Sequence, residues 1–386
     1  MIRQQRFPTD IRVRREVQAL VDDGHQVDVI GLAADGEPLR ATWQGVRIHR
    51  LRLQTRRSSA PRYLFEYGAF ALFAAVLAAV LHLRRRYDLV QVHSLPDPLV
   101  FAALVPKLLG ARVQLDLMET MPEFFSTRFP GAGRRANRIV EAAEQASIRF
   151  ADHVITCTEQ MKEAFVGRGA PAGKIDVILN SADESIFDAG RHPPRERTPG
   201  RFELIVHGTI EERYGIDTAI EAIALLADEI PELELHVFGK GSYREALERL
   251  AEERGVADRV HIRRDFVPLD DLVHAISQAD AGVVAMKRDP FRDLTHCNKM
   301  YELITMRRPQ LMSRTRSVEA YFDADCFAWF ESDDPADLAQ AVRRLHGDPA
   351  LGRELVANAA ARSHPYRWEH QRDHYQQVVR RVLARG

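Results

Sequence analysis

Hydrophobic positions along the chain fall into two alternating kinds of segment. Short runs rich in Val, Ile and Leu are typical of buried strands, and they alternate with longer segments in which apolar residues recur every three or four positions, as on one face of a helix. The strands predicted in the first half span residues 26–32, 88–93, 112–117, 153–158 and 175–180. The helices predicted around them span residues 12–25, 67–83, 98–110, 136–151 and 159–169. Short strands joined by helices predict parallel pairing with crossover helices in a doubly wound α/β layer.

The second half of the chain repeats this pattern. Its predicted strands span residues 202–208, 233–239, 260–266 and 281–286. Helices are predicted to begin at Gly215 and Tyr243, to cover residues 269–278, and to contain Glu302. The tail predicts one further helix, whose apolar stripe consists of Trp368, Tyr375, Val378 and Val382.

We therefore predict two Rossmann-like α/β domains in series. The first covers residues 1–188, and residues 189–201, rich in Pro, Gly and Arg without an apolar period, form a linker. The second domain covers residues 202–364, and a C-terminal helix covers residues 365–386. A doubly wound domain normally begins with a buried central strand, but only six residues precede "FPTD" and the first helix. We expect that first strand to be missing or reduced to a stub, as it would be if the reading frame had been started too late.

Composition and charge exclude several classes of function. The chain has 386 residues, with 54 basic against 55 acidic residues scattered along it, so no net positive field attracts nucleic acid. The three cysteines, Cys157, Cys297 and Cys326, lie far apart and have neither a disulfide nor a metal-type spacing. No apolar stretch follows the basic N-terminus, which predicts no secretory signal peptide. These features favour a reducing, cytoplasmic setting without a metal or other cofactor.

One apolar segment raises the question of a membrane. Residues 67–83 are almost wholly apolar and are followed at once by Arg84, Arg85 and Arg86. The run falls short of the ~20 apolar residues of a membrane span, and Glu66 prevents its extension upstream. Three alternatives remain open: a true span, a buried crossover helix, or a helix whose outer face rests on the lipid interface with its arginines at the headgroups.

Candidate chemistry lies in the loops that follow the strands of the second half. In open parallel sheets, ligands bind beyond the carboxyl ends of the strands, where N–H groups at helix N-termini favour anions. In the first loop, "HGTIEERYG", Gly208 lets the backbone approach a ligand and Arg213 offers a fixed cationic fork for phosphate. Alternatively, Arg213 pairs only with Glu211 or Glu212 in solvent.

The second loop gives a weaker signal. Gly239 and Gly241 form half of a dinucleotide fingerprint, although such glycine pairs often make only a tight turn. Neither half of the chain has a complete G-x-G-x-x-G or a G-K-[ST] loop, which counts against a dehydrogenase and a P-loop NTPase.

The third loop leads into a helix that is predicted to begin near Asn298. Its first N–H groups could hold a diphosphate, Lys299 could add positive charge, and Glu302 could accept hydrogen bonds from ribose hydroxyls. The alternative is an exposed i,i+3 ion pair between Lys299 and Glu302, worth only ~0.2–0.5 kcal/mol.

These stretches resemble the retaining glycosyltransferases of family four, which have the GT-B fold. The most specific matches are "HGTIEERYGIDTAIEAI", similar to the family's nucleotide-diphosphate corner, and "NKMYELITMRRP", similar to its P-x-K-x-x-E-Y helix. The stretches "YDLVQVHSLPDPLVFAALVPKLLGARV" and "FADHVITCTEQ" resemble its N-terminal domain, and the tail resembles the closing helix that crosses back to that domain. The resemblance covers nearly the whole chain. It implies transfer of a sugar from a nucleoside diphosphate donor, with retained anomeric configuration, in a cleft between the two domains and usually without a metal.

The resemblance also implies roles for individual residues. Arg213 would stabilise the leaving diphosphate, the region of Asn298 and Lys299 would hold the phosphates, and Glu302 would bind the ribose. Backbone groups near Phe266 and Val267 would hold the nucleobase. The full set of expected donor-binding residues is Gly208, Thr209, Gly239, Gly241, Phe266, Val267, Asp293 and Asn298.

The chain departs from the family pattern at three places. Where the family has the first of two glutamates eight residues apart, this chain has Leu294, and we expect Asp289 or Asp293 to contact the donor sugar instead. Where the family has a histidine in a pattern like D-x-H-E, this chain has Met118 beside Glu119. The third departure is the reduced first strand.

The candidate acceptor residues are His93 and Glu119. His93 lies at the end of its predicted strand, where it would either touch an acceptor or cap the turn. Glu119 and Glu123 would either orient the acceptor or lie on a solvated helix start.

The preferred hypothesis is a glycosyltransferase that uses a UDP- or GDP-sugar in cell-surface polysaccharide biosynthesis. Its acceptor would be a glycan or a polyprenyl-diphosphate-linked glycan, reached at the cytoplasmic face of the membrane through residues 67–86. One alternative is a degenerate GT-B protein that binds a nucleotide sugar or a partner enzyme without turnover, motivated by Met118 and Leu294. Another alternative is a nucleotide-sugar epimerase on the same fold.

Overall fold

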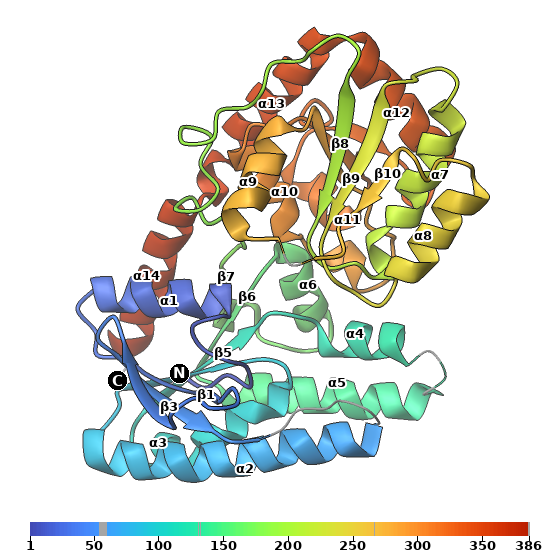
Figure 1. The fold of residues 1–386 in the computed structure, drawn as a ribbon. Coiled ribbons are helices and arrows are strands. Elements are labelled where there is room, and N and C mark those ends of the chain that lie inside the picture. The colour runs from blue at the N-terminus through green and yellow to red at the C-terminus, as the bar shows by residue number, and fades with distance from the viewer. Residues whose placement is uncertain (54–59, 130, 132, 266, 385–386) are drawn as a thin grey trace. The chain divides into compact units, whose positions relative to one another are not determined.

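The computed structural model describes residues 1–53, 60–129, 131, 133–265 and 267–384. The chain divides into two compact units (Figure 1). The first unit contains Met1–Leu179 together with Glu369–Gly386, and the second contains Asn180–Trp368. Each unit is built on a sheet of mainly parallel strands covered by helices, which confirms the predicted pair of Rossmann-like α/β units.

The first unit contains seven described strands in two hydrogen-bonded groups, ordered β1-β3-β2 and β4-β5-β6-β7. All pairs are parallel except β2 with β3. The strands are β1 (Asp28–Leu32), β2 (Arg40–Trp43), β3 (Val46–Leu51), β4 (Leu89–His93), β5 (Arg112–Leu117), β6 (His153–Thr156) and β7 (Ile175–Val177). The helices are α1 (Ile11–Asp22), α2 (Ala60–Arg85), α3 (Leu104–Leu108), α4 (Met121–Arg128), α5 (Gly133–Phe150), α6 (Glu159–Gly167) and α14 (Trp368–Ala384), of which α3 continues a 3₁₀ turn over Asp97–Ala103.

The first residues of the chain occupy the place between β1 and β4. Ile2 forms single parallel bridges with Ile30 of β1 and with Val92 of β4, and its side chain is fully buried. Its N–H donates to the Gln91 carbonyl at 2.9 Å and its carbonyl accepts from His93 N–H at 3.0 Å. A single bridging residue therefore links the two strand groups where a doubly wound domain has its central strand.

The last helix, α14, belongs to the first unit and packs through one apolar stripe. Tyr375, Val378 and Val382 are buried, as the 3.6-residue period predicts. The Tyr375 hydroxyl donates to Gln91 Oε1 at 2.6 Å in the interior. The chain therefore returns to the first unit after completing the second.

The second unit contains a six-stranded, fully parallel sheet with the order β10-β9-β8-β11-β12-β13. The strands are β8 (Phe202–His207), β9 (Leu233–Phe238), β10 (Val260–Ile262), β11 (Ala281–Val284), β12 (Gln310–Ser313) and β13 (Ala328–Phe330). The helices are α7 (Ile216–Leu226), α8 (Arg244–Glu253), α9 (Leu269–Gln278), α10 (Asn298–Thr305), α11 (Arg316–Tyr321), α12 (Pro335–Gly347) and α13 (Pro349–Ser363). Because the strands are parallel, the loops after β8, β9 and β11 lie at the same edge of the sheet.

The core of the second unit lies on one face of β8 and β9. Leu204, Val206, Leu235 and Val237 are buried there and pack against helices α7, α8 and α12. Burying such side chains contributes about 1.5–3 kcal/mol each. The residues that alternate with them in β9, Glu234 and His236, point to the opposite face, which is only partly covered.

Candidate functional site

The loop between β8 and α7 passes directly beneath a lysine from α10. Gly208 adopts a left-handed backbone conformation with φ of 99°, and a Cβ atom placed on it would lie 2.6 Å from Lys299 Cε. Glycine suits this position because its backbone is left-handed, and because a side chain here would displace Lys299. Gly208 and Lys299, predicted as parts of one site from separate loops, are therefore in contact.

Three cations surround the ring of Tyr214 in this loop. Lys299 Nζ lies 3.9 Å from the ring centroid, and the guanidinium carbons of Arg292 and Arg213 lie 5.3 and 5.4 Å from it. An aromatic face attracts cations and holds them in place without neutralising them. We refer to Arg213, Arg292 and Lys299 together as the cation cluster.

In the described part of the chain, no carboxylate lies within ion-pair distance of any member of the cation cluster. The Nε atoms of Arg213 and Arg292 are buried and have no hydrogen-bond partner there. The alternative in which Arg213 pairs with Glu211 or Glu212 is not observed among the described residues, and the Glu211 carboxylate accepts instead from the Ser242 hydroxyl at 3.0 Å. Three unneutralised positive charges held side by side favour the binding of a multiply charged anion.

The charge state of Lys299 reflects this crowding. Burial lowers the pKa of its ammonium group to about 8. Cys297 and Glu302 act to raise this pKa, while Arg292 and Arg213 act to lower it. At neutral pH the lysine is still mostly charged, so it can bind an anion, and a bound anion would raise its pKa again.

Glu302 does not form an i,i+3 ion pair with Lys299, which was one of the two alternatives considered from the sequence. Its Oε2 atom lies 2.6 Å from Nε2 of His207, the last residue of β8. His207 is buried, and the Glu302 side chain is 14% exposed. Within the described residues, Oε1 of Glu302 has no hydrogen-bond partner, so the carboxylate is oriented on one side and available as an acceptor on the other.

The N-terminus of α10 adds backbone donors to the same region. Cys297 precedes the helix and provides no side-chain hydrogen bond to cap it. The first N–H groups of a helix have no partner inside the helix, and the helix dipole makes that end favourable for negative charge. Asn298 is exposed at this end, beside Lys299.

The glycines of the second loop have a packing role. A Cβ atom on Gly239 would lie 1.7 Å from the Gly208 carbonyl oxygen, and one on Gly241 would lie 1.8 Å from the Ile210 carbonyl oxygen. The loops after β8 and β9 therefore touch through their backbones. This contact fixes the loop that carries Gly208 and the exposed Thr209. The roles of these residues in binding a donor stay predictions.

The predicted base contacts are only partly described. Phe266 lies outside the described residues, and Val267 is partly buried at the start of the segment leading into α9. Neither position tests the expectation that backbone groups here hold a nucleobase.

The acidic residues near Leu294 are engaged locally. Leu294 is buried, and Asp293 accepts from Arg288 Nη2 at 3.0 Å and from Arg316 N–H at 3.1 Å. Asp289 accepts from the N–H groups of the 3₁₀ turn that follows it. Contact of either aspartate with a donor sugar stays a prediction, which would require one of these local bonds to be exchanged.

In the first unit, His93 lies in the interior. Its side chain is fully buried, and Nδ1 lies 2.9 Å from Asp116 Oδ2. Burial alone would raise the pKa of Asp116, but Arg12 and His93 together lower it below its usual value. Arg12 binds both oxygens of this carboxylate at 3.0 Å. His93 is therefore held in the interior by Asp116, and its contact with an acceptor stays a prediction.

The other acceptor-side residues lie at the end of β5. Met118 and Glu119 are partly exposed there, so both are accessible to a ligand. Glu123 is bound by Arg168 at 2.6 Å, and Arg168 also binds Glu144 through two hydrogen bonds of 2.8 Å. Glu123 is therefore part of a structural ion-pair network, and the acceptor role of Glu119 stays a prediction.

Sequence reasoning missed Tyr214, Arg292 and His207, which complete the site. Tyr214 and His207 both stand in the stretch "HGTIEERYG" that the sequence analysis singled out. An aromatic residue next to Arg213 was the available signal for a cation-holding ring. Arg292 was one of several charged residues in its loop, and only the folded structure separates it from Lys287 and Arg288, which have carboxylate partners.

Comparison with known proteins gives matches over both units. Residues 10–181 match the model of the Glycosyl transferase 4-like domain. Residues 201–348 match the model of Glycosyl transferases group 1. The two matches correspond closely to the two compact units.

Individual proteins match over different shares of their length. Over 232 residues the chain is 29% identical to glycogen synthase of Mycobacterium tuberculosis, which covers 58% of this chain but only 53% of that enzyme. Over 339 residues it is 25% identical to alpha-D-kanosaminyltransferase of Streptomyces kanamyceticus, covering 82% and 84% of the two chains. Among solved structures, the Anabaena protein HepE in complex with UDP-glucose superposes with a TM-score of 0.70 at 14% identity, covering 98% of both chains.

Proposed function

Because this chain belongs to the group 1 glycosyl transferases, the retaining family-four enzymes of GT-B fold, we propose that it transfers a sugar from a nucleoside diphosphate sugar to a glycan or lipid-linked glycan acceptor. Family membership confirms the resemblance noted in the sequence. That the whole chain transfers a sugar is what we propose.

The cation cluster is the observation that carries this proposal. A nucleoside diphosphate is a multiply charged anion, and the cluster offers it three positive charges that no described carboxylate neutralises. The N-terminus of α10 lies beside Lys299 and adds backbone donors. Guanidinium groups match phosphate oxygens geometrically, so Arg213 and Arg292 would orient the diphosphate as well as attract it.

The same groups would act in the reaction. Breaking the bond between the sugar and the diphosphate leaves negative charge on the leaving group, and fixed cations stabilise that charge as it develops. Partly buried arginines and lysine do this more strongly than exposed ones, because less water competes with them. Oε1 of Glu302 would accept hydrogen bonds from the ribose hydroxyls, while His207 holds the carboxylate in place.

We favour a UDP-sugar over a GDP-sugar as the donor. HepE, whose solved structure contains UDP-glucose, has a similar fold over 98% of this chain. This likeness in fold is the support for choosing uracil as the base. The cation cluster does not distinguish the two bases, because it would contact only the phosphates.

A face of the first unit supports an acceptor at a membrane surface. Helix α2 buries one stripe, formed by Phe70, Ala74 and Ala78, against the unit. Its outer face exposes large apolar side chains, namely Phe65, Leu72, Phe73, Val76, Val80 and Leu83. Residues of the neighbouring 3₁₀ turn and α3 extend this surface, namely Phe101, Leu104, Val105, Leu108 and Leu109. We call these eleven residues the apolar face.

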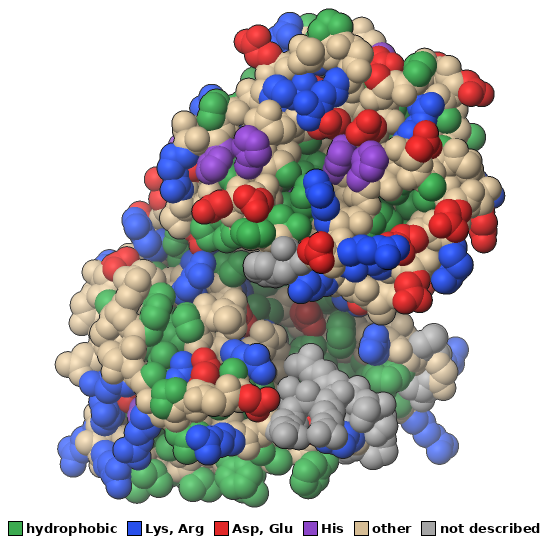
Figure 2. All heavy atoms as spheres, in the orientation of Figure 1, with side chains coloured by type: hydrophobic (Ala, Val, Ile, Leu, Met, Phe, Trp, Pro, Cys, Tyr) green, Lys and Arg blue, Asp and Glu red, His purple; other side chains and the backbone are tan. Residues whose placement is uncertain are grey.

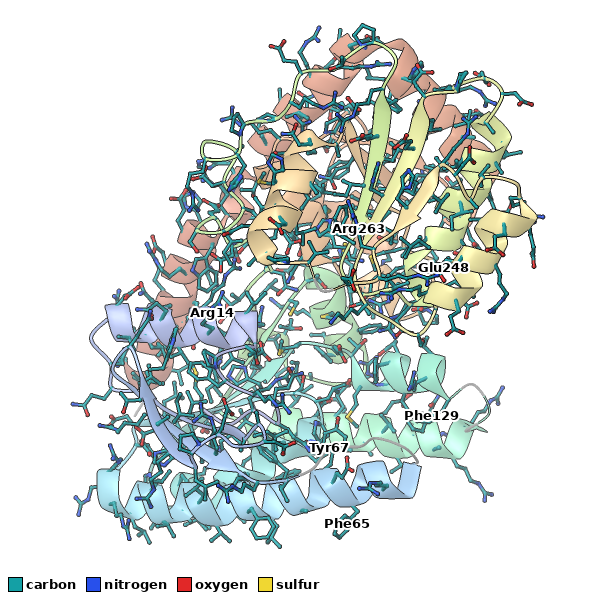
Figure 3. The ribbon with its side chains drawn as sticks, viewed as in Figure 1. Arg14, Phe65, Tyr67, Phe129, Glu248 and Arg263 are labelled. Atoms are coloured by element: carbon teal, nitrogen blue, oxygen red, sulfur yellow. The ribbon has the colours of Figure 1, made fainter. Side chains whose placement is uncertain are left out.

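Exposed apolar surface of this kind marks sites of interaction with a membrane or another protein. Figure 2 shows hydrophobic side chains along the lower edge of the first unit, over α2, with Lys and Arg side chains gathered at one end. Figure 3 shows Phe65 pointing away from the unit and Tyr67 pointing toward it. The helix over Phe65–Arg85 is long and apolar enough to cross a membrane, and 33% of that segment is buried in the unit.

We assign this face to the lipid interface. The buried stripe, together with the exposed Arg84, Arg85 and Arg86 where α2 ends, fits a helix lying in the plane of an anionic membrane. A protein held there would meet acceptors carried on lipids, such as a polyprenyl-diphosphate-linked glycan in cell-surface polysaccharide assembly. The reduced cysteines fit the cytoplasmic side of such a membrane.

Turnover of sugar donors tests the proposed function. Purified protein is given a panel of UDP- and GDP-sugars with and without lipid-linked glycan acceptors, and release of nucleoside diphosphate and transfer of sugar are measured. We expect turnover with at least one donor, and a loss of 100-fold or more in Arg213→Ala, since removing one preorganised charge contact to a developing anion costs about 2.7–4 kcal/mol.

The control is Arg254→Ala, which removes an exposed arginine of the same unit that is bound to Glu221. We expect it to leave turnover unchanged. Binding of a nucleoside diphosphate without any turnover would favour the catalytically degenerate alternative. Absence of both binding and turnover across the panel would overturn the proposal.

A further inference from the structure

A second cluster of potential ligands lies on the partly covered face of the sheet in the second unit. His236 of β9 and His261 of β10 are register partners in neighbouring parallel strands, so their side chains project from the same face. Glu234 stands two residues before His236 and projects from that face as well. Their side chains are 23%, 39% and 43% exposed in the order His236, His261, Glu234, so an ion from solvent can reach all three.

The three side chains converge on one point. His236 Nε2 lies 3.1 Å from Glu234 Oε2, and His261 Nε2 lies 3.3 Å from the same oxygen. The two imidazole rings are tilted by 34°, with centroids 4.8 Å apart. The potential ligand atoms of the three residues all lie within 4.8 Å of one another.

The two separations between a histidine nitrogen and Glu234 Oε2, 3.1 and 3.3 Å, are close to those between the ligands of a tetrahedral Zn²⁺ ion. With metal–ligand distances of about 2.0–2.1 Å, two ligand atoms of a tetrahedral site lie about 3.3 Å apart. We propose that His236, His261 and Glu234 bind a Zn²⁺ ion, with the fourth position open to water. Two imidazole nitrogens and one carboxylate oxygen are ligands that Zn²⁺ accepts readily.

An ion pair lies beside the three potential ligands. Glu203 of β8 is the register partner of Glu234, and its nearest oxygen lies 3.9 Å from His236 Nε2. Arg201 holds both oxygens of Glu203 at 2.5 and 2.6 Å, so this carboxylate is engaged and we do not count it as a ligand. Because its charge is paired with that of Arg201, Glu203 adds little net charge beside the three ligands.

The ion would link the edge strand β10 to its neighbour β9. Strand β10 has three residues and lies at the edge, next to β9. A metal bound by both strands would hold β10 in register against β9. The effect would be a more stable second unit.

A different histidine cluster illustrates what such a site requires. Glu16, His93 and Asp116 also lie close together, but all three are buried and Arg12 occupies both oxygens of Asp116. A metal there would have to displace a guanidinium group in the interior. The cluster on β9 and β10 has no such obstacle. The cysteine spacing gave no hint of a metal, because the ligands here are histidines and a glutamate from two strands.

Metal titration of the full chain tests the proposal. Protein stripped of metal is titrated with Zn²⁺ by calorimetry and with Co²⁺ by visible absorption, whose intensity rises strongly for a four-coordinate ion. We expect one equivalent to bind, with a rise in thermal midpoint. His261→Gln and Glu234→Gln are each expected to weaken binding by tenfold or more.

The controls are His274→Asn and His370→Gln, which remove exposed histidines of α9 and α14. Both are expected to retain binding, and all four variants should keep the circular dichroism spectrum and UDP binding of the unmodified protein. The proposal is overturned if no equivalent binds at millimolar Zn²⁺, if His261→Gln and Glu234→Gln bind as tightly as the unmodified chain, or if Co²⁺ shows only the weak spectrum of a six-coordinate ion.

Discussion

Lys299 has opposite effects on stability and on binding. Burial lowers the pKa of its ammonium group to about 8, below its ordinary value of 10.5. Between these two values the unfolded chain binds more protons than the folded chain, so stability rises with pH in this window, and below it the buried charge costs stability. A lysine kept charged against this cost is typical of a binding site.

The affinity for nucleoside diphosphates should therefore depend on pH through Lys299. The charged lysine binds the anion, so affinity should be constant below about pH 8 and should fall above it, by up to tenfold per pH unit. Calorimetry with UDP at pH 7, 8.5 and 9.5 measures this fall. The terminal phosphate of the ligand ionises near pH ~6, below this range.

The matched control for this pH profile is Lys299→Arg. A guanidinium group stays charged throughout the range, so the affinity of this variant should not fall between pH 8 and 9.5. A flat profile in the unmodified protein would show that Lys299 does not contact the ligand.

At the scale of residues, the sequence could predict the members of the site that stand in recognisable motifs. Gly208, Arg213, Lys299 and Glu302 were identified, and the structure brings Gly208 and Arg213 to Lys299. It could not predict that one tyrosine ring gathers the cations, because that contact joins residues 78 positions apart, from Tyr214 to Arg292. Nor could it show that Glu302 of α10 is held by His207 at the end of β8.

At the scale of elements, α2 gives the sharpest prediction. If its outer face lies in the lipid interface, Phe73→Glu should weaken binding to vesicles containing phosphatidylglycerol by tenfold or more, since burial of one such side chain is worth about 1.5–3 kcal/mol. Replacing Arg84, Arg85 and Arg86 by Gln should weaken it further, by about 1 kcal/mol for each charge lost, in low salt. Vesicle flotation measures both effects.

The control for α2 is Leu225→Glu, which changes a large exposed apolar residue of α7 in the second unit. It should not affect flotation. If Phe73→Glu floats like the unmodified protein, or if the protein binds neutral and anionic vesicles equally well, the assignment of the apolar face to an anionic membrane fails. A dimer that is broken by Phe73→Glu would instead assign the face to a second copy of the chain.

Some helices and strands could be predicted from their pattern of apolar residues, and others could not. Helix α1 was predicted nearly in full, because its apolar period is regular and Asp10 caps it by accepting from the Val13 N–H. The β2–β3 hairpin was not predicted, although Gln44 and Gly45 both have positive φ, as the tight turn between these strands requires. Its strand β2 has alternating exposure and no apolar run, so a search for buried strands passed over it.

At the scale of the whole molecule, the fold followed from the alternation of strands and helices. Each unit buries a parallel sheet between helices, and this requires the runs of Val, Ile and Leu that the sequence displays. The return of α14 to the first unit was implied by the family resemblance and not by the residue pattern. An apolar stripe shows that a helix packs, but not which unit it packs against.

The departures from the family pattern have different structural meanings. Leu294 is buried, so the position is part of the hydrophobic packing beside the cation cluster. Met118 is partly exposed at the end of β5 and could line a binding surface. Neither change removes a member of the cation cluster, which is why we expect the donor to bind and to react.

The central claim is that Arg213, Arg292 and Lys299 bind a diphosphate, and calorimetry of the full chain with UDP and GDP tests it most directly. The account predicts binding by the unmodified protein, a 10- to 100-fold weaker affinity in Arg213→Ala, since hydrogen bonds to charged groups are worth about 1.5–3 kcal/mol, and an unchanged affinity in Arg254→Ala. Equal affinities in all three proteins, or no binding of either nucleotide at millimolar concentration, would contradict it.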